Sequence, residues 1–287
     1  MIPTTFAYEA PTSVAEAVAL LGEDTQVIGG GTWVVPSLNR GDSRSAALVD
    51  LRRAGLGGIS QDGDVIRVGA TCTYAELLAS ELVATHLPLL RTMAAGVTGG
   101  QQILNQGTLG GSVAAARPSS DAPAVVVALG GRLLITGPDG ERAVDAREFF
   151  LGPEHTVLGA RDIVVALEFP SARGLRHGYA KLKHGHSSWP IATAAVILGA
   201  ADSGQPWATL ALGGVTGTPV VVDITGELAD DLLTENGMAA AARLAAERIT
   251  EPWSDVLAPA DYRRTVAPVL AVRAVRMAAG HDEETDA

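Results

Sequence analysis

The 287-residue sequence has one cysteine, Cys72, and few aromatic residues, which make up 4% of the chain. A single cysteine excludes an intrachain disulfide, and it excludes an iron–sulfur cluster or a cysteine-rich zinc site held by this chain alone. Electron transfer through iron and sulfur would therefore need another polypeptide. We expect Cys72 to be a small apolar residue in or beside a strand.

Basic residues and long apolar runs are also scarce. The chain has 21 Lys and Arg against 32 Asp and Glu, a formal net charge of −11, and no basic stripe, which argues against binding to nucleic acid or an anionic membrane. The longest apolar runs, such as residues 191–201, are too short to span a membrane, and the N-terminus does not have the pattern of a signal peptide. The composition therefore predicts a cytoplasmic protein, and 47% hydrophobic residues are enough for a sizeable core.

Glycine is concentrated in two runs about eighty residues apart, GGGTWVVP (29–36) and GTLGGSVAAARPSSDAP (107–123). The first is not a dinucleotide fingerprint, because GxGxxG would need glycine where Val34 stands, and the GK[ST] of a P-loop is absent. Either run alone is typical of a tight turn between strands. Because glycine lets backbone N–H groups approach an anion closely, the two runs together could hold one diphosphate.

Helix and strand signals in the first part of the chain are local. Ser13 with Glu16 predicts a capped helix over residues 13–21, and Thr73 with Glu76 predicts a second short helix. Another helix should begin at Asp121 and end at Gly130. Apolar runs and turn residues predict strands over 64–69 and 163–169, and a hairpin over 130–144.

The polar, glycine-bearing segment 171–178 places a domain boundary near residue 174 and divides the chain into 1–174 and 175–287. The second part should contain three strands followed by two alanine-rich helices, over residues 179–183, 191–199, 207–213, 236–249 and 260–279. Strands followed by helices predict an α+β domain with an antiparallel sheet. Pro268 should kink or split the last helix.

Five segments, in chain order, resemble the FAD-binding medium subunit of the molybdenum hydroxylases, best known from carbon monoxide dehydrogenase. They are MIPTTFAYEAPTSVAEAVALL, AALVDLRR, the two glycine runs, YAKLKHGHSSWPIATAAV and ITEPWSDVLAPADYRRTVAPVLAVRAV. The sequence is also similar to the flavin domain of xanthine dehydrogenase, and the likeness covers about residues 1–278. It implies a two-part FAD-binding domain of the vanillyl-alcohol-oxidase (PCMH) type, followed by a small antiparallel-sheet domain with helices.

The same resemblance implies partners and an electron route. A small subunit would carry two [2Fe–2S] clusters, and a large subunit would carry a molybdopterin cofactor. Electrons would pass from molybdenum through the clusters to FAD, and then to NAD⁺, a quinone or dioxygen. Because neither glycine run contains a His or Cys that could form a covalent link, we expect FAD to be bound noncovalently. The cofactor would perform the redox chemistry, so no residue of this chain is expected to be catalytic.

The resemblance also implies which residues contact FAD. In the family the first run wraps the diphosphate through backbone amides, which corresponds to Ile28, Gly29, Gly30, Gly31 and Thr32, followed by Trp33. The second run contacts the diphosphate and the ribityl chain, which corresponds to Thr108, Gly110, Gly111 and Ser112. Asp121 corresponds to a ligand of the polyol chain, and Val164 to a strand residue beside the isoalloxazine ring. Lys181 corresponds to a positive charge near N1 and O2 of the ring, and Trp189 to an aromatic residue on a mobile loop over one face of it.

Several of these residues have an ordinary structural alternative. Asp121 could be only the N-cap of the next helix. Lys181 could be a solvated strand lysine, Trp33 could pack in the core, and Trp189 could be an ordinary residue of the domain interface. His184 and His186 would face the same side if they alternated along a strand, but no third ligand has a suitable spacing. Loop histidines are the better interpretation, so no metal site is expected.

Four positions depart from the family pattern. Trp33 stands where Ser, Asp or Asn is usual, Leu104 where Arg is usual, Ser112 where Asn is usual, and Arg117 where Asp is usual. These departures leave two alternatives open. One is a stand-alone FAD-dependent oxidoreductase acting directly on a small molecule, and the other is a redox-silent structural subunit that has lost tight flavin binding.

Overall fold

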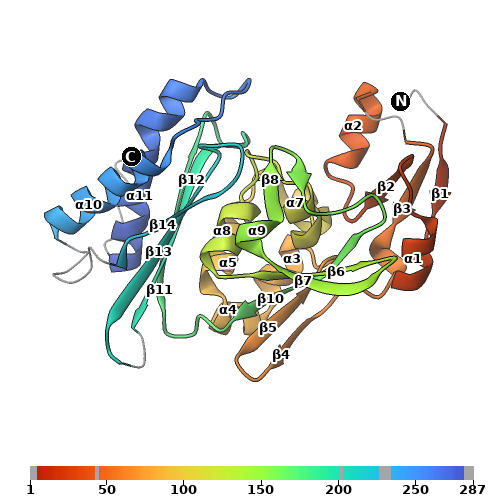
Figure 1. Cartoon of the computed structure of the whole chain (residues 1–287), viewed down its shortest axis with the longest axis horizontal. Coiled ribbons are helices and arrows are strands. Elements are labelled where there is room, and N and C mark those ends of the chain that lie inside the picture. Colours follow the sequence, from red (N-terminus) through yellow and green to blue (C-terminus); the bar gives the residue numbers. More distant parts are fainter. Residues whose placement is uncertain (1–4, 43–44, 201–202, 226–233, 281–287) are drawn as a thin grey trace.

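The computed structural model describes residues 5–42, 45–200, 203–225 and 234–280. Figure 1 shows three sheets arranged along the longest axis, with the N-terminal part at one end and the C-terminal sheet with its two long helices at the other. The structure contains both helices and strands, as the sequence predicts. In the described part of the chain, no helix is both long enough and apolar enough to cross a membrane.

The N-terminal part is a three-stranded parallel sheet in the order β1-β3-β2. Its elements are β1 (Ala7–Glu9), α1 (Val14–Leu20), β2 (Thr25–Ile28), α2 (Val34–Arg40), β3 (Ala47–Asp50) and the 3₁₀ turn Leu51–Arg53. Only half of the predicted first capping box forms. Ser13 Oγ accepts from the Glu16 amide at 3.2 Å, but the Glu16 carboxylate accepts from the Thr12 amide at 2.7 Å instead of from Ser13.

The central part is a five-stranded antiparallel sheet in the order β4-β5-β10-β6-β7, with short helices around it. The strands are β4 (Ile59–Asp62), β5 (Val65–Gly69), β6 (Arg132–Gly137), β7 (Gly140–Asp145) and β10 (Ile163–Pro170), and a small β8–β9 pair (Phe150–Gly152, His155–Thr156) lies outside the sheet. The helices are α3 (Tyr74–Ala79), α4 (Glu81–His86), α5 (Pro88–Ala95), α6 (Gly100–Gln106), α7 (Leu109–Ala114), α8 (Ala122–Ala128) and α9 (Ala146–Phe149). The predicted capping box at Thr73 and Glu76 is complete. Cys72 is buried beside β5, as expected.

The C-terminal part is a four-stranded antiparallel sheet in the order β11-β12-β13-β14. It comprises β11 (Arg176–Lys183), β12 (Pro190–Ala200), β13 (Pro206–Gly213) and β14 (Val220–Asp223), followed by α10 (Glu235–Arg248) and α11 (Ala260–Ala279). Helix α11 packs on one face of the sheet, while α5 and α8 of the central part pack on the other (Figure 1). This double coverage explains why almost all of β12 is buried.

The structure corrects two expectations for this part. Helix α11 continues through Pro268, so the helix is not split. Strand β14 is present although the sequence signals did not predict it. Strand β11 ends at Lys183, so His184 and His186 lie in the following loop, as expected. Among the described residues no cluster of three His, Cys, Asp or Glu side chains is placed to hold a metal.

Candidate functional site

A cavity of about 670 Å³ lies where the three parts of the chain meet. Both glycine runs line it, and the second domain adds Ser187, Trp189 and Pro190 from the loop before β12. This volume is within the range of about 300–1,000 Å³ that is typical of small-molecule and cofactor sites. The two runs, distant in sequence, therefore face one site.

The first glycine run presents free backbone donors to this cavity. Among the described residues, the backbone N–H groups of Gly30, Gly31 and Thr32 have no hydrogen-bond partner. The first backbone N–H after them that donates a hydrogen bond within this loop is that of Val35, which donates to the Gly31 carbonyl at 3.0 Å. Gly31 has a φ of +71°, a left-handed conformation that favours glycine. A Cβ on Gly30 would lie 1.5 Å from the Gln106 carbonyl oxygen, so only glycine allows this close approach. Adjacent free amides in such a turn form an anion-binding concavity.

The second run uses its amides within the fold. Leu109 donates to the Cys72 carbonyl and Gly110 donates to the Ala70 carbonyl, both at 3.0 Å. The Gly111 amide donates to Oγ1 of Thr108, the N-cap of α7, at 3.1 Å. A Cβ on Gly110 would lie 2.6 Å from the Ala70 oxygen, so this glycine is required by packing and not by the cavity. The second run therefore offers side chains to the cavity instead of backbone donors.

Ser112 is one of those side chains. Its Oγ accepts a 2.7 Å hydrogen bond from the hydroxyl of Tyr74, which also lines the cavity. Burial raises the pKa of the Tyr74 hydroxyl, so the phenol stays protonated and remains a donor. The serine hydroxyl can then donate its own proton to a ligand.

Asp121 precedes α8, but its side chain makes no capping hydrogen bond. It accepts instead from two residues of β11, the Tyr179 hydroxyl at 2.5 Å and Lys181 Nζ at 2.8 Å. Lys181 also donates to the Gly96 carbonyl at 3.0 Å, and burial and the Asp121 charge raise the pKa of Tyr179. The interpretations of Asp121 as only a cap and of Lys181 as a solvated lysine are both wrong, because each charged side chain is only 9% exposed.

Two tryptophan rings and the guanidinium group of Arg117 meet at the cavity wall. The rings of Trp33 and Trp189 lie 5.5 Å apart at an interplanar angle of 60°. The guanidinium carbon of Arg117 lies 3.3 Å from the Trp33 ring centroid and 4.9 Å from that of Trp189, a cation–π arrangement. Trp33 is half-buried and lines the cavity, so the expectation of core packing is wrong. Trp189, 41% exposed, joins the two domains through these contacts.

Of the residues that the sequence singled out, the structure gathers twelve around the cavity: Gly29, Gly30, Gly31, Thr32, Trp33, Thr108, Gly110, Gly111, Ser112, Asp121, Val164 and Trp189. Two do not line it. Ile28 is buried with Leu38 and Leu48 in the N-terminal core, and Lys181 reaches the cavity only through Asp121. Leu104 packs against the central hydrophobic core, so this departure from the family pattern lies outside the cavity lining.

Sequence reasoning missed three contributors to the site. Tyr74 and Tyr179 have no local pattern that marks them, because their partners Ser112 and Asp121 are distant in the chain. Arg117 was noticed as a departure from a family position, but its place between two indole rings could not be read from the sequence.

Comparison with known proteins gives matches along nearly the whole chain. Residues 4–172 match the family model described as the FAD binding domain in molybdopterin dehydrogenase, and residues 177–278 match the CO dehydrogenase flavoprotein C-terminal domain. The carbon monoxide dehydrogenase medium chain of Afipia carboxidovorans is 34% identical, with 97% of this chain and 98% of the relative aligned. The nicotine 6-hydroxylase medium subunit of Paenarthrobacter nicotinovorans is 30% identical, with 93% and 95% aligned.

Solved structures agree with these matches. A chain of the carbon monoxide dehydrogenase from Hydrogenophaga pseudoflava superposes with a TM-score of 0.91 at 33% identity, covering 98% of this chain and 99% of that one. Quinoline 2-oxidoreductase from Pseudomonas putida 86 gives a TM-score of 0.87 at 30% identity, with 97% and 98% covered.

Proposed function

The chain belongs to the FAD-binding medium subunits of the molybdenum hydroxylases, and from this premise we propose that it passes electrons from iron–sulfur clusters of a partner subunit through FAD to an external acceptor. The observation that carries the proposal is the row of free amides at Gly30, Gly31 and Thr32, which faces a cavity of cofactor size. The lone Cys72 supports partners, because clusters need several thiolate ligands from elsewhere.

The residues around the cavity fit FAD. The free amides of the first run would hold the diphosphate, since backbone N–H groups without a Cβ in front of them suit an anion. The Ser112 hydroxyl and the Asp121 carboxylate would bind the polyol chain, and Val164 would lie beside the ring. FAD, when bound, would supply the two-electron redox chemistry.

We assign residues 1–174 to a two-part domain of the vanillyl-alcohol-oxidase type and 175–287 to the C-terminal domain.

The chain's own residues would bind and orient the cofactor and shield it from water. Lys181 would act through Asp121, because its ammonium group is bound to that carboxylate and to Gly96 and does not line the cavity. Trp33, Arg117 and Trp189 would limit the access of water to one end of the cavity, since these three side chains contact one another and form part of its wall.

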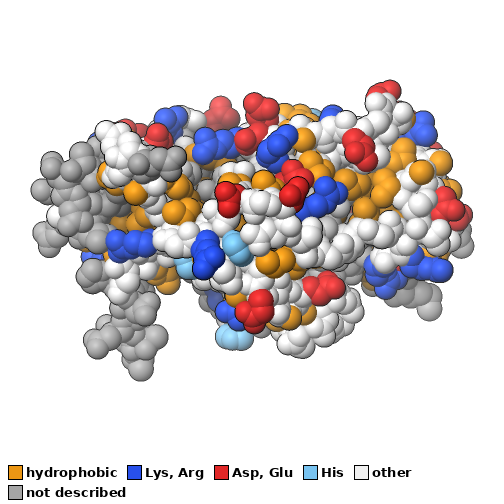
Figure 2. All heavy atoms as spheres, turned by 90° about the horizontal axis from the view of Figure 1, so that it is seen from below, with side chains coloured by type: hydrophobic (Ala, Val, Ile, Leu, Met, Phe, Trp, Pro, Cys, Tyr) orange, Lys and Arg blue, Asp and Glu red, His pale blue; other side chains and the backbone are white. Residues whose placement is uncertain are grey.

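The partners that we propose are a small subunit with [2Fe–2S] clusters and a large subunit with a molybdopterin cofactor. Relatives that align with nearly all of this chain are the medium chains or medium subunits of multi-subunit enzymes. The surface is compatible with protein partners, because Figure 2 shows acidic and basic side chains interspersed and not gathered by sign on the face that it presents.

The test is to purify the full chain, titrate it with FAD, and then precipitate it with acid. We expect one FAD per chain and its complete release into solution, because no cysteine or histidine among the described residues lines the cavity to form a covalent link. A protein that binds no flavin would contradict the proposal and favour the redox-silent subunit. Reduction of bound flavin by an organic substrate, without partner subunits, would favour the stand-alone oxidoreductase.

A further inference from the structure

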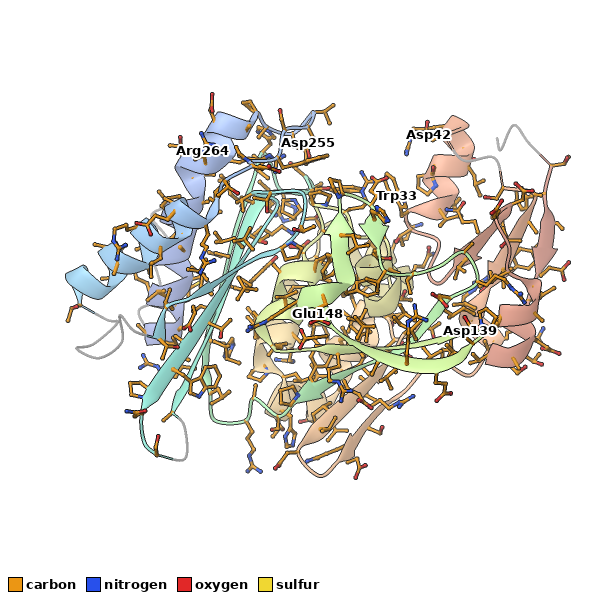
Figure 3. The ribbon with its side chains drawn as sticks, in the orientation of Figure 1. Trp33, Asp42, Asp139, Glu148, Asp255 and Arg264 are labelled. Carbon is orange, nitrogen blue, oxygen red and sulfur yellow. The ribbon has the colours of Figure 1, made fainter. Side chains whose placement is uncertain are left out.

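Tyr179 belongs to the C-terminal sheet, but its side chain is buried in the core of the central part. It lies on β11, and it is a member of the hydrophobic cluster built mainly from central helices and strands. Side chains two residues apart on a strand face the same side, and both Tyr179 and Lys181 contact Asp121 across the domain boundary. Figure 3 shows that side chains fill the space between the C-terminal sheet and the central helices. Tertiary packing therefore brings the Tyr179 hydroxyl to Asp121.

The two donors use the oxygens of the Asp121 carboxylate unequally. Lys181 Nζ lies 2.8 Å from Oδ1 and 3.0 Å from Oδ2, whereas the Tyr179 hydroxyl donates to Oδ1 alone, at 2.5 Å. A carboxylate has about four acceptor positions, two on each oxygen. These donors fill both positions of Oδ1 and leave one position of Oδ2 for a ligand in the cavity, which Asp121 lines.

The Tyr179 hydroxyl has an effect that the lysine cannot have alone. An ammonium group that spans both oxygens does not distinguish between them, and the Cβ–Cγ torsion of aspartate is broad and nearly two-fold. A second donor on Oδ1 fixes which oxygen is left for the ligand. Burial and the charge of Asp121 raise the pKa of Tyr179, so the hydroxyl stays protonated and remains a donor.

We propose that Tyr179 is a positioning residue that acts through Asp121, directing one carboxylate oxygen to FAD and reducing the negative charge that the carboxylate presents to the cofactor. This role rests on the proposed function. A carboxylate beside a redox cofactor disfavours the electron-rich state of that cofactor, because like charges repel. A charge-assisted hydrogen bond to the carboxylate weakens this repulsion. Tyr179 should therefore favour reduced FAD over oxidised FAD, although it does not itself line the cavity.

The N-terminal part contains a similar group of residues away from the cavity. Asp50 is buried at the end of β3, and it accepts hydrogen bonds from the Tyr8 hydroxyl and from Arg52 Nε, the latter at 2.9 Å. None of these three residues lines the cavity. Tyr8→Phe is therefore the matched control for Tyr179→Phe. Each variant removes a hydroxyl from a buried aspartate that also pairs with a cation, and only one of the two aspartates faces the proposed cofactor.

The experiment uses the full chain. Oxidised FAD is titrated into each variant, and the reduction potential of bound FAD is then measured anaerobically against a dye of known potential. In Tyr179→Phe we expect the binding of reduced FAD to weaken about 3- to 10-fold more than the binding of oxidised FAD, which lowers the potential by about 15–30 mV. In Tyr8→Phe the ratio of the two affinities should stay unchanged, whatever stability that variant loses in urea unfolding.

A second pair of variants tests whether Tyr179 acts through Asp121. Asp121→Asn keeps the shape of the side chain and removes its charge, so it should shift the ratio of affinities in the opposite direction, toward reduced FAD. In that background Tyr179→Phe should change the ratio by less than about twofold, because the charge on which it acts is gone. Asp121→Asn alone tests the effect of the charge if Tyr179→Phe does not fold.

The outcomes separate this role from the proposed function. A native chain that binds no FAD would contradict the function and this role with it. FAD that binds to Tyr179→Phe with an unchanged potential would leave the function intact and overturn the role. An equal shift of the potential in Tyr8→Phe would overturn it too, because loss of stability would then explain both variants. So would an Asp121→Asn variant with the native potential, or an undiminished effect of Tyr179→Phe in the Asp121→Asn background.

Discussion

The two glycine runs look alike in sequence and differ in what their backbones do. In the first run the amides of Gly30, Gly31 and Thr32 are free to bind a ligand, and the glycines are needed because this loop touches the Gln106 carbonyl. In the second run the amides of Leu109 and Gly110 tie α7 to the segment after β5. A glycine-rich sequence therefore indicates close backbone approach, but only the partners of its amides show whether a ligand or the fold requires it.

The largest effect should come from Gly30→Ala. The added Cβ would meet a backbone oxygen at 1.5 Å, so the two runs must separate and the free amides must move. We expect FAD affinity to fall about 100-fold or more, equivalent to about 2.7 kcal/mol, in an FAD titration. Gly22→Ala is the control, because nothing lies within 4 Å of its Cβ. Equal affinity in both variants would show that the first run is only structural.

Asp121→Ala tests whether the second run acts through side chains. It leaves Lys181 buried without its carboxylate, so we expect a loss of about 3 kcal/mol of unfolding free energy, together with weaker FAD binding. Asp145→Ala is matched, because Asp145 is a true N-cap whose carboxylate accepts from the Arg147 amide at 2.8 Å. That control should lose about 1 kcal/mol in urea unfolding and keep its FAD affinity. If Asp121→Ala behaves in the same way as the control, Asp121 does not contact the ligand.

Gly110→Ala should separate stability from binding. Its Cβ would contact Ala70 and not the cavity, so a phosphate oxygen would not be displaced directly. We expect about 1–3 kcal/mol of destabilisation in urea unfolding, with FAD affinity of the folded variant nearly unchanged. A large loss of affinity without loss of stability would restore the second run as a backbone phosphate site.

Ser112→Ala should have a smaller effect, restricted to the ligand. The variant removes one hydroxyl from the cavity and leaves the Tyr74 hydroxyl without its acceptor. We expect FAD to bind about 3- to 10-fold more weakly, as is usual for a single neutral hydrogen bond. Tyr74→Phe removes the same internal bond without removing the serine, so similar losses in both variants would show that Ser112 only supports Tyr74.

The smallest effect should come from Asp162→Asn, which changes a residue outside both glycine runs and is tested by the pH dependence of stability. Asp162 lines the cavity, and its pKa is lowered by hydrogen bonding to Arg142, at 2.6 Å, and to the Gly159 amide. A carboxyl group whose pKa is lower in the folded state than in the unfolded state stabilises the fold at pH values above its unfolded-state pKa. This stabilisation disappears as the pH falls through the folded-state pKa. The stability difference between the native chain and Asp162→Asn, under about 1 kcal/mol at neutral pH, should therefore vanish in acid. A difference that persists at the lowest pH would show that it does not come from the charge.

The sequence predicted those structural features that depend on residues close together in the chain. The Thr73–Glu76 capping box and the hairpin of β6 and β7 follow from local spacing, and the structure has both. It did not predict the use of the Gly110 amide, because the acceptor is the Ala70 carbonyl forty residues earlier. The pairing of Asp121 with Tyr179 and Lys181 was missed for the same reason, since these partners come from β11.

The local context was also misleading at two places. Proline usually interrupts a helix, yet α11 continues through Pro268. A tryptophan in a mostly apolar segment suggests core packing, but Trp33 lies against Arg117, whose position beside the cavity is fixed only by tertiary structure. At both places the contacts that decide the outcome come from tertiary structure.

The buried pair of Asp121 and Lys181 joins α8 of one domain to β11 of the next. The charge of one cavity wall is thus balanced from a strand that belongs to the sheet of the C-terminal domain and packs mainly against β12 and α11 of that domain. A shift of β11 relative to α8 changes the electric field in the cavity even if every cavity-lining atom stays in place. The reduction potential and colour of a bound flavin would then report how the two domains are docked, and a partner that presses on the distant sheet could tune the cofactor without touching it.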